Sequence, residues 1–225
     1  MTDLQVSGRN ITVSGAGDTV IWFNAFAEES AGLHAKLTES GIGGCTLVTV
    51  DVPDWDAALS PWRAEALSPD SEPFPGNAPD YLHLLTDTIM PEVSAACGLS
   101  PRRNLLAGYS LAGLFAVWAF WQTDRFDAAA SVSGSMWYPG FAEYVCSHAP
   151  CRVSEQIYLS LGDRECRTRH PLLSAVQENT ERVYRRMQEL HADTVFELNP
   201  GGHTKHAAQR TAKGIAWLLG REGAR

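Results

Sequence analysis

Basic residues are scarce in this sequence. Its 225 residues contain 18 Lys and Arg against 26 Asp and Glu, which gives a formal net charge of -8. A nucleic acid or an anionic membrane would require clustered Lys and Arg on its partner protein. The charge balance therefore argues against both of these partners and favours a small molecule.

Long hydrophobic runs are also absent. No stretch approaches the roughly 20 apolar residues that are needed to cross a bilayer. The first residues, Met1 to Val6, do not show a basic segment followed by an apolar one, as a secretory signal would. We therefore expect a soluble, cytoplasmic protein.

Cysteines are few and follow no ligand pattern. The sequence has an odd number, and it contains no C-x-x-C motif or Cys/His cluster. Reduced thiols therefore fit better than a disulfide framework or a zinc site, although one pair could still oxidise. We expect no metal and no other cofactor. The five cysteines are Cys45, Cys97, Cys146, Cys151 and Cys166, and the pair is Cys146 with Cys151.

Linkers, repeats and low-complexity tracts are lacking as well, and 44% of the residues are hydrophobic. A chain of this length and composition can bury the core of one α/β domain. We therefore predict a single domain over residues 1–225.

Strand and helix patterns alternate along the chain. Dense β-branched and aromatic segments predict buried strands, and apolar residues at helical spacing predict helices between them. This alternation predicts an α/β fold with a mostly parallel sheet and helices on both faces. Strands are expected at 19–23, 46–50, 103–107, 128–132, 156–161 and 194–198, an opening hairpin or edge strand at 4–6 and 10–13, and a long loop at 51–80. Helices are expected at about 30–40, 81–98, 111–122, 174–190 and 206–219.

The segment Gly108-Tyr109-Ser110-Leu111-Ala112-Gly113 lies where a predicted strand passes into a predicted helix. A nucleophile elbow requires small residues two before and two after the serine, because the turn between strand and helix is sharp. Gly108 and Ala112 meet this requirement, although the usual motif has Gly at the position of Ala112. Ser110 is thus the candidate nucleophile, and an ordinary turn with Ser110 as an N-cap is the alternative.

A serine nucleophile needs a base, and in α/β-hydrolases the acid and then the histidine follow the serine along the chain. His203, in Gly201-Gly202-His203, comes directly after the last predicted strand. His206 is the competing base, and we assign it to the start of the terminal helix. His203 and His206 also form an H-x-x-H pair, but no third metal ligand lies nearby in the sequence.

The acid is expected after the strand that ends at Leu161, where Asp163 and Glu165 compete. An acid that orients the histidine has to reach across the sheet edge, which takes a few residues beyond the strand. We therefore favour Glu165 over Asp163. The neighbouring Arg164, Arg167 and Arg169 pair with either carboxylate or attract an anionic substrate.

Together, these motifs resemble the esterases related to enterochelin esterase. The resemblance covers nearly the whole chain and implies an α/β-hydrolase fold without a large cap domain, with ester hydrolysis by a serine and a histidine assisted by an acid. That family includes siderophore, feruloyl and acetyl esterases and acyltransferases, so the resemblance does not select a substrate. It rests on Gly108 to Ala116, Ser133-Gly134-Ser135-Met136-Trp137, Leu161 to Glu165, Pro200 to His203, Asp54-Trp55 and Ser60-Pro61-Trp62.

Two backbone N–H groups should stabilise the oxyanion. We expect one from Leu111, at the start of the helix after Ser110, and the other from Phe26, in the turn after the strand at 19–23. Asn24-Ala25 does not match the His-Gly pair that is common at that turn.

Six aromatic residues fall on segments expected near the top of the sheet, where they form a substrate-binding wall or simply pack under long loops. Only residues 134–154 stand where larger hydrolases insert a lid, so the site should be open. The aromatic residues are Trp55, Trp62, Phe74, Trp137, Tyr138 and Phe141.

The sequence therefore predicts a serine hydrolase that cleaves carboxylic esters. The alternatives are an acyltransferase or a peptidase with the same residues, because an acyl-enzyme reacts with water, alcohols or amines. A hydrolase-fold binding protein without activity is a further alternative. The sequence does not predict the oligomeric state.

Overall fold

The computed structural model of this chain describes residues 1–153 and 156–220, with the backbone alone over residues 27–31. The described residues form one eight-stranded sheet with the strand order β1-β2-β4-β3-β5-β6-β7-β8. β1 pairs with β2 and β2 with β4 in antiparallel fashion, and the remaining neighbours are parallel. The strands are β1 (Thr2–Val6), β2 (Arg9–Gly15), β3 (Thr19–Ala25), β4 (Thr46–Asp51), β5 (Arg103–Tyr109), β6 (Ala128–Val132), β7 (Gln156–Gly162) and β8 (Asp193–Asn199).

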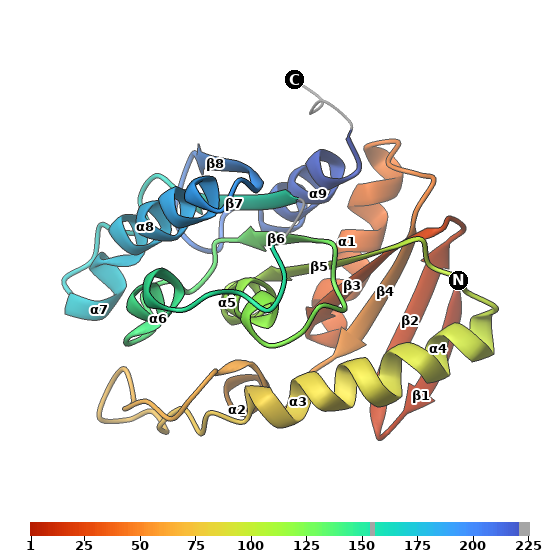
Figure 1. Ribbon diagram of the computed structural model, residues 1–225, viewed down its shortest axis with the longest axis horizontal. Coiled ribbons are helices and arrows are strands. Elements are labelled where there is room, and N and C mark those ends of the chain that lie inside the picture. Colours follow the sequence, from red (N-terminus) through yellow and green to blue (C-terminus); the bar gives the residue numbers. More distant parts are fainter. Residues whose placement is uncertain (154–155, 221–225) are drawn as a thin grey trace.

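Helices cover both faces of this sheet (Figure 1). Strand residues alternate between two apolar clusters, as the two-residue period of a strand requires. Trp22 and Leu106 belong to the cluster that also contains residues of α5, whereas Ile21 and Leu105 belong to the one beneath α1 and α9. One face carries α1 (Ala27–Glu39) and α9 (Ala207–Leu218); the other carries α2 (Trp55–Leu59), α3 (Ala78–Leu84), α4 (Met90–Cys97), α5 (Leu111–Trp118), α6 (Phe141–Ser147) and α8 (Val176–Glu189).

This architecture confirms the predicted fold class, a mostly parallel sheet between helices without a large cap domain. The predicted strands are all present, and residues 4–6 and 10–13 form the predicted opening hairpin at the edge of the sheet. The predicted lid position holds only a short connection with α6; its last predicted residue, 154, lies outside the described residues.

Two predicted elements were partly wrong. The expected loop at 51–80 contains the one-turn helix α2, a bridge between Ala64 and Phe74, and the start of α3. The expected helix at 81–98 begins at Ala78, and a π-helical turn, η1 (Leu85–Ile89), separates α3 from α4. Pro91 explains that turn, because its ring would clash with the carbonyl group of residue 87 in a regular α-helix.

Two further predicted helices differ from the observed helices at their ends. The helix predicted to about 122 consists of α5 followed by a 3-10 turn, η2 (Ala119–Trp121). The helix predicted at 174–190 is α8, preceded by the single turn α7 (Pro171–Ser174).

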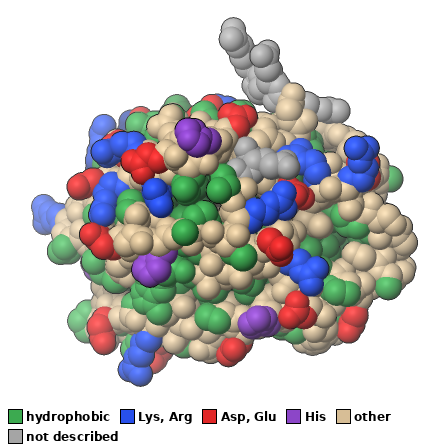
Figure 2. Space-filling view, in the orientation of Figure 1, with side chains coloured by type: hydrophobic (Ala, Val, Ile, Leu, Met, Phe, Trp, Pro, Cys, Tyr) green, Lys and Arg blue, Asp and Glu red, His purple; other side chains and the backbone are tan. Residues whose placement is uncertain are grey.

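The distribution of charged side chains on the surface is consistent with the negative net charge of the sequence. Acidic and basic side chains are mixed on the face shown in Figure 2 and do not gather into one basic area. In the two described ranges, no helix has the length and apolar character that crossing a bilayer would require.

Cys146 and Cys151 are both exposed and form no disulfide with each other in this structure.

Candidate active site

Ser110 lies in a sharp turn between β5 and α5. Its backbone has a φ of 57° and a ψ of -121°, a strained conformation for a residue with a side chain. The turn brings the start of the helix so close to the strand that a Cβ atom on Gly108 would lie 2.3 Å from the backbone of Ala112. Glycine is therefore required at position 108, as expected for a nucleophile elbow.

His203 lies on the connection between β8 and α9, opposite this turn. Its Nε2 atom is 3.0 Å from the Oγ atom of Ser110. Within this connection Gly201 has a φ of 113°, and its N–H donates to Asp163 at 2.8 Å. This hydrogen bond ties the histidine loop to the neighbouring loop after β7.

Glu165 lies on that neighbouring loop and contacts the other nitrogen of the same imidazole. Its Oε2 atom is 2.7 Å from Nδ1 of His203, and the Glu165 side chain is only 4% exposed. Burial alone would raise the pKa of Glu165. Hydrogen bonds from His203, Ser133 and the N–H of Gly162 outweigh this effect and lower the pKa to about 2. The carboxylate is therefore ionised at neutral pH.

Asp163 and His206, the competing candidates, lie elsewhere. Asp163 accepts from Gly201, is exposed, and has Arg164 3.9 Å away. His206 is the exposed N-cap of α9 with a φ of 57°. The structure thus joins Ser110 to His203 and His203 to Glu165, and it places Asp163 as a support of the histidine loop.

The two expected oxyanion donors come from the ends of neighbouring strands, one directly after β3 and one at the start of the helix that follows β5. Leu111 is the first residue of α5, where a backbone N–H has no acceptor within its own helix. Phe26 directly follows β3, and the pairing of Asn24 with Gly108 continues toward Phe26 and Ser110 at the same edge of the sheet. This placement suits both N–H groups for a developing negative charge.

The sequence did not predict four polar residues around these side chains. Ser135 places its Oγ atom 3.4 Å from Oγ of Ser110 and donates its N–H to the Ser110 carbonyl group. Ser133 donates to Glu165 at 2.7 Å, and Arg210 lies 3.0 Å from the same carboxylate oxygen. Tyr109 donates to the backbone carbonyl group of His203. Residues 133–137 belong to the motifs that carry the family resemblance, but the sequence predicts no role for Ser133 or Ser135. No feature of the sequence indicates a role for Arg210.

Most of the six predicted aromatic residues serve packing. Tyr138 and Phe141 are fully buried, and Phe74 is 7% exposed. The indole of Trp62 donates to the carbonyl group of Pro139. Trp55 differs, because it stacks at 4.5 Å on the ring of Phe26, which is 42% exposed next to the turn that holds Ser110.

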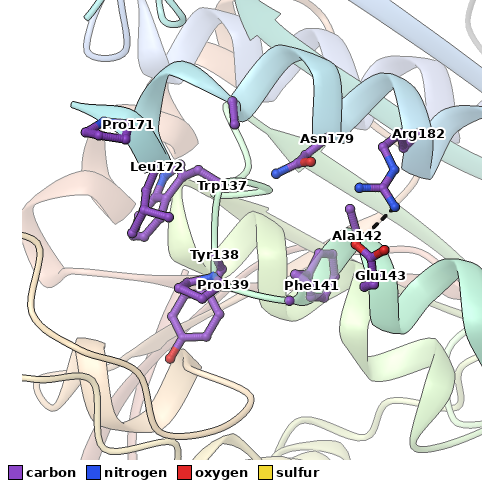
Figure 3. A pocket seen from close by; sticks show the side chains of 12 residues that line it. Trp137, Tyr138, Pro139, Phe141, Ala142, Glu143, Pro171, Leu172, Asn179 and Arg182 are labelled. Atoms are coloured by element: carbon purple, nitrogen blue, oxygen red, sulfur yellow. Dashed lines mark hydrogen bonds and ion pairs between the residues drawn. The ribbon is translucent and has the colours of Figure 1, made fainter. Parts of the chain in front are cut away.

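Trp137 lines a pocket of about 140 Å³ that is formed by residues of α6, α7 and α8 and of the connection before α6 (Figure 3). One end of the pocket is apolar, with Leu172 near Trp137, and an ion pair of 3.1 Å between Arg182 and Glu143 borders the other. The lining residues are Trp137, Tyr138, Pro139, Gly140, Phe141, Ala142, Glu143, Pro171, Leu172, Ala175, Asn179 and Arg182.

Metal-binding clusters of three or more His, Cys, Asp or Glu side chains do not occur among residues 1–153 and 156–220. The imidazole of His203 lies between a hydroxyl group and a carboxylate, and it can accept a proton from the first while the second stabilises the resulting charge.

Known proteins share this architecture. The chain is similar to the siderophore hydrolase EstA from Aspergillus nidulans, with a TM-score of 0.70 and 18% identity over 96% of this chain and 91% of EstA. It is also similar to the enterobactin hydrolase IroE, solved in complex with DFP, with a TM-score of 0.72 and 17% identity over 97% of this chain and 94% of that one. At such identities the likeness establishes the α/β-hydrolase fold.

Sequence comparisons give the family. The chain is 24% identical to the uncharacterized protein YbbA from Bacillus subtilis over 170 residues, which are 72% of this chain and 68% of YbbA. The model of the esterase family, described as "Putative esterase", matches residues 8–209. This match spans most of the chain, so the protein belongs to the esterase family.

Proposed function

We propose that this esterase hydrolyses carboxylic esters through an acyl-enzyme on Ser110. One observation carries the proposal: a continuous chain of contacts links the Glu165 carboxylate to Nδ1 of His203 at 2.7 Å and Nε2 of His203 to the Ser110 hydroxyl group at 3.0 Å. Nucleophile, acid and base follow one another along the chain in the order of α/β-hydrolases, and all three lie at the carboxyl edge of the sheet.

Acylation begins when Oγ of Ser110 attacks the ester carbonyl carbon and Nε2 of His203 takes the hydroxyl proton. Glu165 holds the imidazole in the tautomer with a proton on Nδ1 and stabilises the imidazolium ion. The negative charge on the carbonyl oxygen is received by the N–H groups of Leu111 and Phe26. Collapse of this intermediate breaks the bond to the alcohol, which leaves with the proton from His203.

Deacylation repeats these steps with water. His203 removes a proton from the water molecule, and the resulting hydroxide attacks the acyl carbon. The carboxylic acid then leaves, and Ser110 regains its proton. The exposed position of the His203 side chain, at 43%, supports access of water and of varied substrates to the site.

Hydrolysis of short p-nitrophenyl esters tests this proposal. Ser110→Ala and His203→Ala should each lower kcat by about 10,000-fold or more, because nucleophile and base act as one unit. For the same reason, the double variant should be no slower than the single ones by more than a few fold. His206→Ala is the matched histidine control and should keep most of the activity. A Ser110→Ala variant with wild-type turnover would overturn the proposal.

A further inference from the structure

Arg210 is a buried arginine in the first turn of α9, and its side chain is only 4% exposed. A guanidinium group is always charged, so burying it costs free energy unless acceptors surround it. Its two terminal nitrogens meet this need at two different places in the candidate active site. Nη2 lies beside Glu165 and Ser133, whereas Nη1 lies beside Tyr109 and Gly202.

The contacts of Nη2 determine how the Glu165 carboxylate is oriented. Nη2 is 3.0 Å from Oε1 of Glu165 and also donates to the Ser133 hydroxyl group, which lies 2.7 Å from the same oxygen. The N–H of Gly162 donates to Oε1 as well. Three donors therefore occupy Oε1, and Oε2 remains directed at Nδ1 of His203.

Nη1 reaches the backbone carbonyl groups of Gly202 and His203, the first directly and the second through the Tyr109 hydroxyl group. Nη1 is 3.4 Å from the carbonyl oxygen of Gly202 and 3.3 Å from the hydroxyl oxygen of Tyr109. That hydroxyl group in turn donates to the carbonyl oxygen of His203. The Cζ atom of the guanidinium group also lies over the ring of Tyr109, 5.8 Å from its centroid.

We propose that Arg210 is a positioning residue that holds the Glu165 carboxylate and the His203 loop in register, so that the imidazole meets Ser110 at hydrogen-bonding distance. This inference rests on the proposed function. Arg210 reaches the reaction only through Glu165 and the histidine loop, which makes it a support of the reacting groups. A guanidinium group suits this role because its planar fork serves two sets of acceptors at once, whereas the single nitrogen of lysine cannot.

Steady-state kinetics of Arg210→Lys and Arg210→Ala test the proposal. A misplacement of about 1 Å in catalytic groups can cost about 100-fold in rate, so kcat should fall by at least about 10-fold in the first variant and about 100-fold in the second. KM should change by less than about twofold, because Arg210 does not touch the substrate. Lys213→Met is the control: Lys213 is also in α9 and also pairs with a carboxylate, that of Glu197 at 2.8 Å, but outside the site.

Chemical rescue separates positioning from mere stability. Added guanidinium chloride, well below denaturing concentrations, should raise the kcat of Arg210→Ala several fold, whereas sodium chloride at the same ionic strength should not. A thermal unfolding measurement on each variant checks that the assay temperature lies below its Tm. If Arg210→Ala does not fold, Tyr109→Phe replaces it, because this variant removes only the hydroxyl group between Arg210 and the His203 carbonyl group; its kcat should fall at unchanged KM.

Folded Arg210→Lys or Tyr109→Phe protein with the kcat of the wild type would overturn the inference while leaving the serine mechanism intact. Failure of the proposed function has a different signature, since the wild-type protein itself would then show no Ser110-dependent hydrolysis.

Discussion

The Glu165 carboxylate and the Arg210 guanidinium group form an ion pair of 3.0 Å in which both side chains are only 4% exposed. The pair lies directly behind the imidazole of His203, because the second oxygen of Glu165 is 2.7 Å from Nδ1. The candidate active site thus contains a buried charge network, and the imidazole and the serine hydroxyl group form its outward end.

Glu165 and Asp163 should differ in their effects on turnover. Glu165→Ala should lower kcat by about 100-fold to 10,000-fold, since the acid selects the tautomer of the histidine and stabilises its charged form. Asp163→Asn should cost less than about 10-fold, because an amide oxygen can still accept from the N–H of Gly201. Parallel kcat measurements on equally folded variants show which carboxylate acts as the acid. A larger loss of kcat for Asp163→Asn than for Glu165→Ala would show that the acid is misassigned.

The second oxyanion donor can be removed by one substitution. Phe26 has a φ of -75° and follows an extended residue, so proline fits there and deletes the N–H. Phe26→Pro should lower kcat by about 100-fold to 1,000-fold, the usual cost of one oxyanion donor.

Phe26→Ala is the control for that substitution, because it removes the ring that stacks on Trp55 and keeps the N–H. Its kcat should stay within about 10-fold of the wild-type value, well above that of Phe26→Pro. Equal losses in the two variants would contradict a role for the Phe26 N–H.

The low pKa of Glu165 predicts a loss of stability in acid. Its ordinary pKa of 4.5 falls to about 2 in the folded protein, so ionised Glu165 stabilises the fold at pH values above 4.5. This contribution, about 3 kcal/mol, is lost as the pH falls from about 4.5 to about 2. Urea unfolding between pH 7 and pH 3 should show the decline, and Glu165→Gln should show less of it. An equal decline in both proteins would contradict the prediction.

Gly108 should tolerate no side chain. A Cβ atom there would lie 2.3 Å from backbone atoms of Ala112, so Gly108→Ala should lower the free energy of unfolding by at least about 2 kcal/mol. Gly32→Ala is the control, since a Cβ at this position in α1 has no described atom within 4 Å apart from the helix's own backbone; it should gain about 0.5–1 kcal/mol. Chemical denaturation measures both, and a neutral Gly108→Ala would contradict the tight turn.

The elements that the sequence predicted well are those with local signals. Buried strands of β-branched residues gave the sheet, and the small residues around Ser110 gave the sharp turn before α5. The placement of His203 and Glu165 followed from their positions just beyond β8 and β7, because parallel strands bring their carboxyl ends to one edge. The fold prediction is confirmed, whereas the catalytic roles of these residues stay predictions.

What the sequence did not predict depends on contacts between distant segments. Arg210 lies in an amphipathic helix, where an arginine is ordinarily solvent-exposed, and the packing of α9 against β5, β6 and β7 buries it beside Glu165. The hydroxyl groups of Ser133 and Tyr109 likewise gain partners 32 and 94 residues away. The π-helical turn before Pro91 was not predicted, because the apolar spacing of a helix continues through it.

Covalent labelling of Ser110 tests the central claim most directly. The folded protein is incubated with a fluorophosphonate probe, and the modified peptide is identified by mass spectrometry, with Ser110→Ala and Ser135→Ala as matched serine variants. We predict a single phosphonylated residue, Ser110, in the wild-type protein and in Ser135→Ala, and no label in Ser110→Ala. Folded wild-type protein that stays unlabelled at Ser110, or that carries the label on Ser135, would contradict the account.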